Sequence, residues 1–324
     1  MENDFLLKSL DIAKISYKID EPLAQKSTFK VGSTAAIYII PKTTEEFISV
    51  TGAVNASEEK YFILGGGSNV VFPDKPFDGV IISTECLNNF TKTDDDLPDN
   101  LPPDTVLIKC QAGTRIQTLV NFCTKSNISG LEEFAGLPGT VGGALYMNAR
   151  CFNKSISDII YDTTSFTVLN HQKLTEKTSP FNPQEWDYKK SPFQTQKAQP
   201  AKIITEATFI LKQKSPQEHD DIEKACQKFI KERQDKGHFK YPSAGSVFKN
   251  NHLFGKPSGQ LIDEAGLKGT IIGGAQIAPF HGNFIININH ASADDIKELV
   301  KLAKKTVKEK FNFDLENEII FLEN

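Results

Sequence analysis

The sequence predicts an α+β protein with mixed sheets and with helices on one side of them. Short apolar strands alternate with single amphipathic helices over residues 36–130, and residues 166–209 consist mostly of strand and loop. Two amphipathic helices follow. The 324 residues suffice for two or three domains, and we divide them into residues 1–76, 77–213 and 214–324.

The first unit is predicted from two strands and the helix between them. Residues 36–40 form a strand, and Thr43 caps a helix with acidic residues in its first turn. The apolar face of this helix carries Phe47, Val50 and Val54. Residues 61–64 form a second strand, which leads into a glycine-rich stretch.

The second unit combines a strand, a helix and a solvated loop. Residues 106–111 form the strand, and the helix runs from Thr114 until Gly130 stops it. The apolar face of the helix carries Ile116, Leu119, Val120 and Cys123. The acidic, proline-bearing segment 94–104 is the loop.

Two capped helices define the third unit. Ser215–Pro216 places a cap before a proline at the first helical position, and the predicted buried stripe is Ile222, Cys226, Phe229 and Ile230. The last helix begins at Ser292, with Asp295 three residues on. Its apolar face carries Ile296, Leu299, Val300, Ala303 and Val307.

Two glycine-rich stretches without charge are the strongest functional signal. One is LGGGSNVVF (64–72) and the other FAGLPGTVGGALYMNA (134–149). Successive backbone N–H groups in such turns suit a phosphate or pyrophosphate, although tight turns between elements would also need glycine. Together the stretches indicate a dinucleotide with a large ring system. Neither the G-x-G-x-x-G nor the P-loop spacing is present, and residues 70–72 read as a strand, so no helix dipole would assist the first loop.

Composition excludes several classes of protein and site. The net charge of −4 gives no general affinity for nucleic acid or membranes, and no signal peptide or membrane helix is visible. No cluster has metal-site spacing. The odd number of cysteines, without a C-x-x-C pair, indicates reduced thiols of an intracellular protein: Cys86, Cys110, Cys123, Cys151 and Cys226.

The chain resembles the UDP-N-acetylenolpyruvoylglucosamine reductases, flavoenzymes of peptidoglycan synthesis, in the shorter subtype without a tyrosine-bearing lid insertion. The most specific motif is YPSAGSVFKN (241–250). The two glycine stretches, IGGAQIAPFHGNFIIN (272–287) and LENEIIFL (315–322) follow the family order. The resemblance implies a two-part FAD-binding domain of the PCMH/vanillyl-alcohol-oxidase type (residues 1–76 and 77–213) and a smaller α+β substrate-binding domain (214–324).

The resemblance also implies the cofactors, the partners and the reaction. The implied cofactors are FAD and NADPH. Apart from the resemblance, we expect a cytoplasmic monomer, and the net charge of −4 predicts no nucleic-acid or membrane partner. The implied substrate is a UDP-sugar, UDP-N-acetylglucosamine enolpyruvate, which becomes UDP-N-acetylmuramate. The implied FAD-binding residues are Gly65, Gly66, Gly67, Ser68, Asn69, Gly136, Pro138, Gly139, Thr140, Gly142, Gly143 and Asn148.

Two alternatives to this function remain. One is another FAD oxidoreductase on this scaffold, such as an oxidase, and the other is a catalytically weakened flavin- or nucleotide-binding paralogue.

Three catalytic residues follow from the resemblance. Ser246 would protonate the carbon next to the carboxylate after hydride arrives at the vinyl carbon, and Glu318 would lie near the enol ether and carboxylate. Residue alternation cannot separate Glu318 from Glu316, because both face one side of an extended strand; the family pattern selects Glu318, and we interpret Glu316 as solvated.

The third catalytic position departs from the family. Lys189 stands where the family has the arginine that holds the enolpyruvyl carboxylate, and lysine lacks the planar fork of a guanidinium. Either Lys189 or Lys190 reaches the carboxylate, or Arg150 does. A strand would place the two lysines on opposite faces, so only one should matter.

The remaining family positions concern substrate binding. Lys236, three residues after Arg233, would meet the diphosphate, although Gly237-His238 replaces the usual Gln-Pro. The other implied substrate-binding residues are Tyr188, Asn250, His281 and Asn283.

Overall fold

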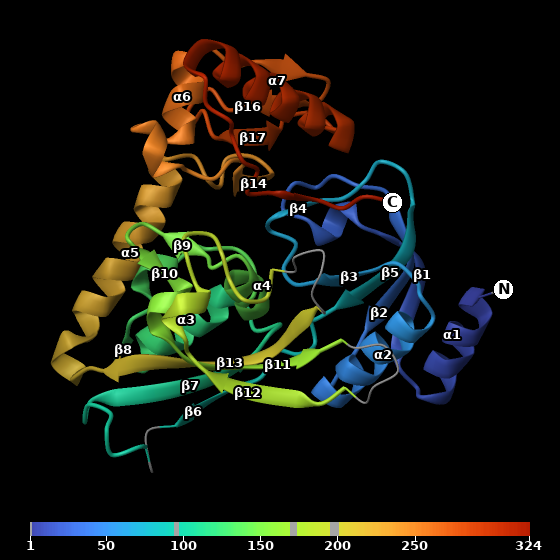
Figure 1. Ribbon diagram of the computed structural model, residues 1–324. Helices are drawn as coiled ribbons and strands as arrows, with labels where there is room; N and C mark the ends of the chain where they lie inside the picture. The colour runs from blue at the N-terminus through green and yellow to red at the C-terminus, as the bar shows by residue number, and fades with distance from the viewer. Residues whose placement is uncertain (1, 94–96, 169–173, 195–200) are drawn as a thin grey trace. The chain divides into compact units, whose positions relative to one another are not determined.

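The computed structural model describes residues 2–93, 97–168, 174–194 and 201–324 (Figure 1). The chain forms two compact units that interleave along the sequence. Unit 1 comprises Met1–Lys18, Ile37–Gly66 and Val80–Ile230, and unit 2 comprises Ile19–Ala36, Gly67–Gly79 and Lys231–Asn324. The chain passes from one unit to the other within three strands, one loop and one helix, so neither unit is a continuous segment.

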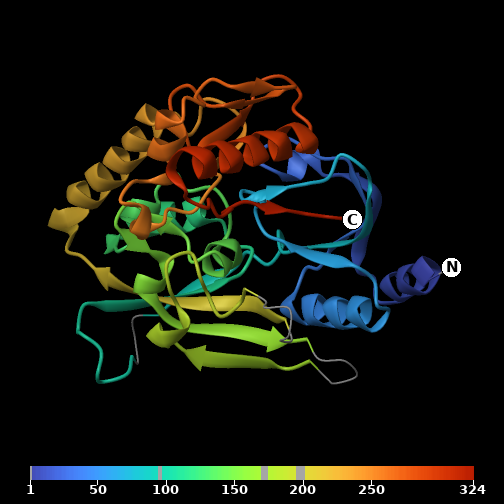
Figure 2. The ribbon, with the colours of Figure 1, turned by 45° about the horizontal axis from the view of Figure 1, so that its top comes forward.

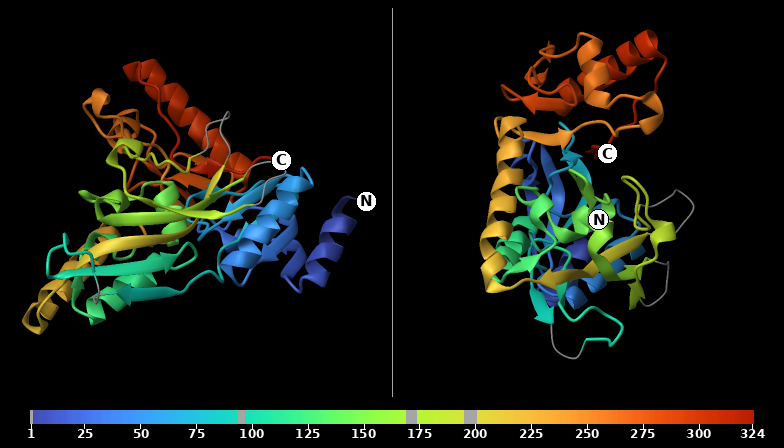
Figure 3. Two further views of the ribbon diagram at one scale, coloured as in Figure 1. Left: turned by 60° about the horizontal axis from the view of Figure 1, so that its bottom comes forward. Right: turned by 90° about the vertical axis from the view of Figure 1, so that its left-hand side faces the viewer.

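A six-stranded antiparallel sheet forms one layer of unit 1 (Figure 3). Its strand order is β12-β11-β13-β7-β6, and β8 also pairs with β13. The bounds are β6 (Phe90–Thr93), β7 (Thr105–Gln111), β8 (Ile128–Ser129), β11 (Ile160–Thr167), β12 (Glu176–Pro180) and β13 (Lys202–Gln213). The helices α3 (Ile116–Lys125) and α4 (Val141–Tyr146) share a core with β7 and β13, so the second glycine stretch, which contains α4, is anchored on a rigid sheet.

A second sheet has the order β1-β2-β5-β3. Its strands are β1 (Ser16–Pro22), β2 (Thr34–Ile40), β3 (Tyr61–Leu64) and β5 (Phe77–Ser83), of which β3 and β5 run parallel. The helices α1 (Glu2–Ile12) and α2 (Thr44–Ala56) contact each other. The first glycine loop begins where β3 ends, which fixes its starting point.

Unit 2 contains a four-stranded sheet with the order β14-β17-β16-β15 and the helix α7 packed against it (Figure 2). The strands are β14 (Ser243–Ser246), β15 (Ile271–Ile272), β16 (Ala275–Ile277) and β17 (Phe284–Asn287); the helices are α6 (Ser258–Glu264) and α7 (Ala293–Phe311). A separate parallel pair joins β4 (Val70–Val71) to β18 (Ile320–Phe321). This pair brings the C-terminal segment beside the end of the first glycine loop.

The remaining elements are short or cross the boundary between the units. The helix α5 (His219–Asp235) crosses it, and β9 (Arg150–Cys151) pairs with β10 (Lys154–Ser155). Single 3-10 turns lie at Ala24–Lys26, Glu132–Phe134, Ile156–Ile159, Pro183–Glu185, Pro216–Glu218 and His252–Phe254.

The structure confirms several predicted elements. Thr43 caps α2 and Ser292 caps α7, in each case by accepting a hydrogen bond from the N–H three residues on. The predicted apolar faces of α2, α3 and α7 are buried. Of the cysteines, Cys110, Cys123, Cys151 and Cys226 are buried and Cys86 is partly exposed, all as free thiols.

Two predicted helix boundaries were wrong. The helix from Thr114 ends at Lys125 rather than near Gly130, because Asn127 adopts φ +56° and turns the chain into β8. Ser215–Pro216 opens a 3-10 turn rather than the α-helix, which begins at His219. The Ser215 cap itself is present.

The predicted solvated loop is confirmed over residues 97–104, and residues 94–96 lie outside the described part. In the ranges that the structure describes, no helix is both long and apolar enough to cross a membrane. Those same ranges contain no group of three potential metal ligands.

Candidate active site

The two glycine stretches pack directly on each other within unit 1. A Cβ atom added to Gly66 would lie 2.6 Å from Cα of Gly139, and one added to Gly65 would lie 2.6 Å from Oγ1 of Thr140. Real Cβ atoms do not approach other atoms so closely, so a side chain at Gly66 would require the loops to separate, and one at Gly65 would displace the Thr140 side chain. Two segments that the sequence pattern predicted to act together are therefore in contact.

The second stretch is shaped by positive backbone angles and a helix cap. Gly136 has φ +77° and Gly139 has φ +111°, both in the region that favours glycine. Thr140 caps α4 by accepting a hydrogen bond from the N–H of Gly143. A Cβ atom on Gly142 would lie 2.9 Å from Cβ of Ala112, so this glycine lets α4 approach the residue that follows β7 closely.

The first loop continues into unit 2 at Gly67, which has φ +63°. A side chain at Gly67 would collide with the carbonyl of Lys26. The N–H of Thr28 donates to the carbonyl of Gly67 at 3.1 Å. The Thr28 hydroxyl is buried and has no hydrogen-bond partner in the described ranges, which leaves a polar group beside this loop for a ligand.

Ser246 and Glu318 are brought together through Val247, all within unit 2. The backbone N–H of Glu318 donates to the carbonyl of Val247 at 2.7 Å. The carbonyl of Glu318 in turn accepts a hydrogen bond from the side-chain amide of Asn69 at 2.9 Å. These bonds tie the serine strand, the C-terminal segment and the end of the glycine loop into one assembly, which we call the Ser246–Glu318 junction.

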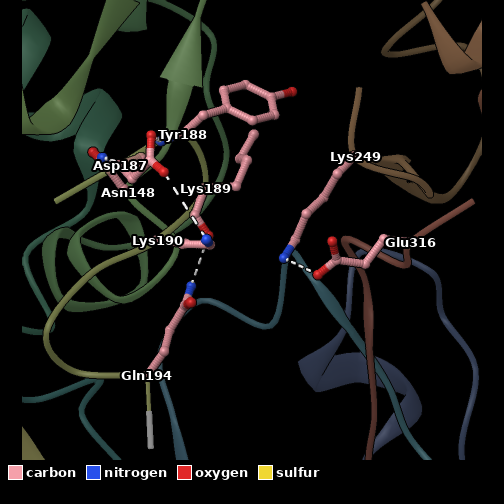
Figure 4. A network of polar contacts seen from close by, with 8 residues as sticks. All are labelled: Asn148, Asp187, Tyr188, Lys189, Lys190, Gln194, Lys249 and Glu316. Atoms are coloured by element: carbon pink, nitrogen blue, oxygen red, sulfur yellow. Dashed lines mark hydrogen bonds and ion pairs between the residues drawn. The ribbon is translucent and has the colours of Figure 1, made fainter. Parts of the chain in front are cut away.

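The two acids of the C-terminal segment differ in environment. The side chain of Glu316 is 72% exposed and forms an ion pair with Lys249, with 2.5 Å between Nζ and Oε1 (Figure 4). Glu318 is partly buried at the junction. The structure therefore distinguishes two acids that residue alternation left equivalent; Glu316 is solvated as predicted, and its carboxylate is engaged by a lysine.

The side-chain amides of Asn283 and Asn250 hold backbone in unit 2. Asn283 accepts from the N–H of Phe248 at 2.9 Å and donates to its carbonyl at 2.8 Å. Asn250 accepts from the N–H of Ser258 at 2.9 Å, at the start of α6. Both predicted substrate-binding residues thus also shape the segment that follows Ser246.

The predicted strand around Lys189 is wrong, because residues 187–190 form a tight turn. The N–H of Lys190 donates to the carbonyl of Asp187 at 3.0 Å, and Lys189 has φ +56°. Two side chains hold the turn by donating to its backbone carbonyls, Asn148 to Asp187 at 2.8 Å and Gln194 to Lys189 at 3.1 Å (Figure 4). Just after the turn, the Ser191 hydroxyl donates to the carbonyl of Tyr146 at 2.8 Å.

The turn separates the two candidate lysines by burial. Lys189 is only 9% exposed. The side chain of Lys190 is 67% exposed and its ammonium lies 3.9 Å from a carboxylate oxygen of Asp187. Arg150 donates to the hydroxyl of Ser155 at 3.1 Å in the β9–β10 hairpin. Lys189 is thus the most buried of the three candidate cations.

A second group of cationic side chains lies at the end of α5. Arg233 is 6% exposed. Burial, followed by the charges of Arg233, His281 and Lys236, lowers the pKa of His238 to about 4. Burial and Lys236 also lower the pKa of His281. Both imidazoles are therefore neutral at neutral pH.

Sequence patterns missed several residues that the structure adds to the site. Thr28 lies in no glycine motif, and its relation to Gly67 depends on a contact across the sequence. Lys249 belongs to the serine motif, yet only the folded tail reveals its partner Glu316. The carbonyl of Glu318 accepts a hydrogen bond from Asn69. Such a backbone acceptor cannot be recognised from the residue types in the sequence.

Comparisons with known proteins match both parts of the chain. The family model "UDP-N-acetylenolpyruvoylglucosamine reductase, C-terminal domain" matches residues 237–322, and the model "FAD binding domain" matches residues 35–170. The UDP-N-acetylenolpyruvoylglucosamine reductase of Treponema denticola is 40% identical over 93% of this chain and 92% of its own length. That of Caldicellulosiruptor bescii is 34% identical over 99% of this chain and 95% of its own length.

A solved structure agrees with these relatives. The crystal structure of UDP-N-acetylenolpyruvylglucosamine reductase (MurB) from Thermus caldophilus is 28% identical, with a TM-score of 0.70. The alignment covers 95% of this chain and 99% of that structure.

Proposed function

The chain belongs to the UDP-N-acetylenolpyruvoylglucosamine reductase family, and from this premise we propose how its residues perform the reaction. It is an FAD-dependent oxidoreductase with the α+β fold of that family. The reaction we propose is the reduction of the enolpyruvyl group of UDP-N-acetylglucosamine enolpyruvate by NADPH. The product is UDP-N-acetylmuramate, a precursor of peptidoglycan.

The residues around the glycine loops fit FAD. Glycine at Gly65 and Gly66 lets the first loop pack closely on Gly139 and Thr140, and we propose that backbone N–H groups of these loops donate to the pyrophosphate. The buried hydroxyl of Thr28 offers a further donor beside Gly67. The residues that we propose to hold the cofactor are Gly65, Gly66, Gly67, Ser68, Asn69, Gly136, Pro138, Gly139, Thr140, Gly142 and Gly143. Asn148 acts by holding the Asp187–Lys190 turn. FAD, when bound, supplies the hydride chemistry.

Ser246 is the proposed proton donor. The reduced substrate must gain a proton at the carbon next to its carboxylate, and a positioned hydroxyl can deliver one when nearby groups stabilise the resulting alkoxide. The observation that carries this proposal is the Ser246–Glu318 junction. Hydrogen bonds of the backbone fix the serine strand and the acid-bearing tail relative to each other before any substrate binds, so the acid does not depend on a flexible terminus.

Lys189 is the proposed cation for the enolpyruvyl carboxylate. Negative charge develops at this carboxylate as hydride arrives, and a fixed positive charge stabilises it most when water is excluded. The burial of Lys189 and the two side chains that anchor its turn support this choice over Lys190. The neighbouring Tyr188 would contact the substrate from the same turn.

The remaining proposed contacts serve the sugar nucleotide. Lys236 and His281 would meet its charged groups. Asn250 and Asn283 would act mainly as positioning residues, because their amides already hold the backbone after Ser246.

NADPH as the reductant, a monomeric state and a cytoplasmic location are further parts of the proposal. We also keep the functional division into residues 1–76 and 77–213 for FAD and 214–324 for substrate.

Purified protein tests this function. We expect the visible absorption of bound FAD, and NADPH oxidation that depends on UDP-N-acetylglucosamine enolpyruvate and yields a product heavier by two hydrogens. Oxidation of NADPH by oxygen alone at the same rate would instead favour another FAD oxidoreductase on this scaffold. Bound FAD without turnover would favour a weakened paralogue.

A further inference from the structure

The end of α5 folds back on itself and brings His238 beside Arg233. The N–H of Gly237 donates to the carbonyl of Gln234 at 2.9 Å. The N–H of His238 donates to the carbonyl of Arg233 at 3.0 Å. With Gly237 at φ +82°, this is a Schellman closure of the helix. The Gly-His pair that replaces the family's Gln-Pro thus builds a specific local structure.

A second imidazole lies on the same aromatic ring. The ring centroid of His238 is 4.6 Å from that of Phe284, and that of His281 is 4.2 Å from it, with the latter two rings stacked. Lys236 acts on the pKa of both histidines and Arg233 on that of His238. Four groups that carry or can carry positive charge therefore gather in unit 2; we call Arg233, Lys236, His238 and His281 the imidazole cluster.

Two further lysines and two acids lie near the cluster, and each acid is paired with a lysine. Lys268 acts on His281 and pairs with Asp263 at 2.7 Å. Lys240 lies 5.1 Å from the ring of Phe280, which packs against Gly237. Glu232 lies 3.9 Å from the ammonium of Lys236. Each of these two acids is already engaged by a lysine, so the field at the imidazoles favours an added anion.

The two imidazoles have different roles towards an anion. Nδ1 of His281 lies 3.2 Å from the backbone N–H of Asn283, which assigns Nδ1 as the acceptor and leaves the proton on Nε2. His281 can thus donate a hydrogen bond while neutral. His238 is kept neutral by burial and by its positive neighbours, and a bound anion would reverse the second of these effects.

We propose that His238 takes up a proton from solvent when the diphosphate of a nucleotide sugar binds at the imidazole cluster, where the proposed function already places Lys236 and His281. The inference rests on the proposed function and adds to it a coupling between substrate binding and protonation. The diphosphate is a diester, so its acid groups stay ionised across the range in which histidine titrates. The proton taken up on binding therefore belongs to the protein.

Isothermal titration calorimetry with UDP-N-acetylglucosamine tests the coupling. The titration is run at about pH 5.5, between the lowered pKa of His238 and the ordinary histidine value, in two buffers of different ionisation enthalpy. We expect the wild-type protein to take up a substantial fraction of a proton per ligand, and its affinity to rise as the pH falls from about 7.5 to 5.5. Absence of binding, or binding without proton uptake, would overturn the inference.

Two variants assign the proton. His238→Gln should still bind the ligand but take up fewer protons, whereas His290→Asn, at an exposed histidine with positive φ in unit 2, should match the wild type. Equal uptake in His238→Gln and the wild type would overturn the role of His238. Reductase turnover of the wild type keeps the two claims apart: turnover without proton uptake refutes only this inference, and lack of turnover refutes the proposed function.

Discussion

The backbone of Glu318 is held by hydrogen bonds through both its N–H and its carbonyl. Its N–H and carbonyl are held by Val247 and Asn69 at 2.7 and 2.9 Å. Replacement of the side chain should therefore leave the junction intact. Glu316, two residues earlier, is exposed and paired with Lys249, and provides a matched control.

Glu318→Gln should lower turnover by ~10²–10⁴, the range for a lost proton-transfer or charge-positioning group, while FAD stays bound and is still reduced by NADPH. Glu316→Gln should remain within a few-fold of the wild type. Steady-state kinetics of the two variants make the comparison. Equal losses of turnover in both variants would show that the negative charge of the C-terminal segment matters, and not the specific position of the Glu318 carboxylate.

Lys189 and Lys190 make a second matched pair. Lys189→Ala should lower turnover by ~10²-fold, the typical loss when one stabilising group is removed from developing charge, and Lys190→Ala should have little effect because its side chain is exposed. Lys189→Arg should be tolerated, since a guanidinium can make the same contact. If both alanine variants matched the wild type and Arg150→Ala were inactive, the cation would be Arg150.

His238 should also make stability depend on pH. Its pKa is about 4 in the folded protein and near 6.5 in the unfolded chain, so the unfolded chain binds more protons between these values. The free energy of unfolding should therefore fall as the pH falls from about 6.5 to 4. Chemical denaturation across this range should show a smaller decrease for His238→Gln; an unchanged decrease would assign the effect to other groups.

Among the elements, the contact between the two glycine loops is the feature on which the proposed cofactor site depends. The loops belong to segments more than seventy positions apart in the sequence, Gly65–Gly66 and Gly139–Gly143. The backbone of Gly139 lies so close to Gly66 that it leaves no room for a side chain there. The packing of α4 on β7 and β13 holds the second loop. Displacement of one loop should therefore affect the cofactor more than the fold.

Gly66→Ala should lose most of its FAD but retain a folded core, because the new Cβ atom would lie 2.6 Å from Cα of Gly139. Gly52→Ala, in α2, meets only the end of the Leu174 side chain at 3.2 Å and serves as the control. The ratio of flavin to protein absorbance in the purified variants is the measurement. A full FAD content in Gly66→Ala would place the pyrophosphate elsewhere.

Local signals in the sequence predicted those elements whose ends are set by local chemistry. The caps at Thr43 and Ser292 and the apolar faces that follow them are examples. The turn at Lys189 was not predictable, because a lysine at positive φ is held there by Asn148 and Gln194 from both sides of the turn. Likewise, periodicity could not separate Glu316 from Glu318, since their difference arises from contacts with Lys249 and Val247.

In the molecule as a whole, the two units cannot be recognised from the order of elements along the chain, because each unit is assembled from separate segments. Unit 2 is completed by Ile19–Ala36 and Gly67–Gly79 in addition to its C-terminal part. The first glycine loop runs from one unit into the other, and the parallel pairing of β4 with β18 joins its far end to the tail that carries Glu318. The family motifs, read in sequence order, identified these segments but not the pairing.

The central claim is that this protein reduces an enolpyruvyl sugar nucleotide with Ser246 as the proton donor. Its most direct test follows the two half-reactions by flavin absorbance without oxygen, in the wild type and in Ser246→Ala. NADPH should bleach both proteins at similar rates. UDP-N-acetylglucosamine enolpyruvate should then restore the absorbance of the wild type rapidly and that of Ser246→Ala slower by ~10²–10⁴. Restoration at the same rate in both, or none in the wild type, would contradict the account.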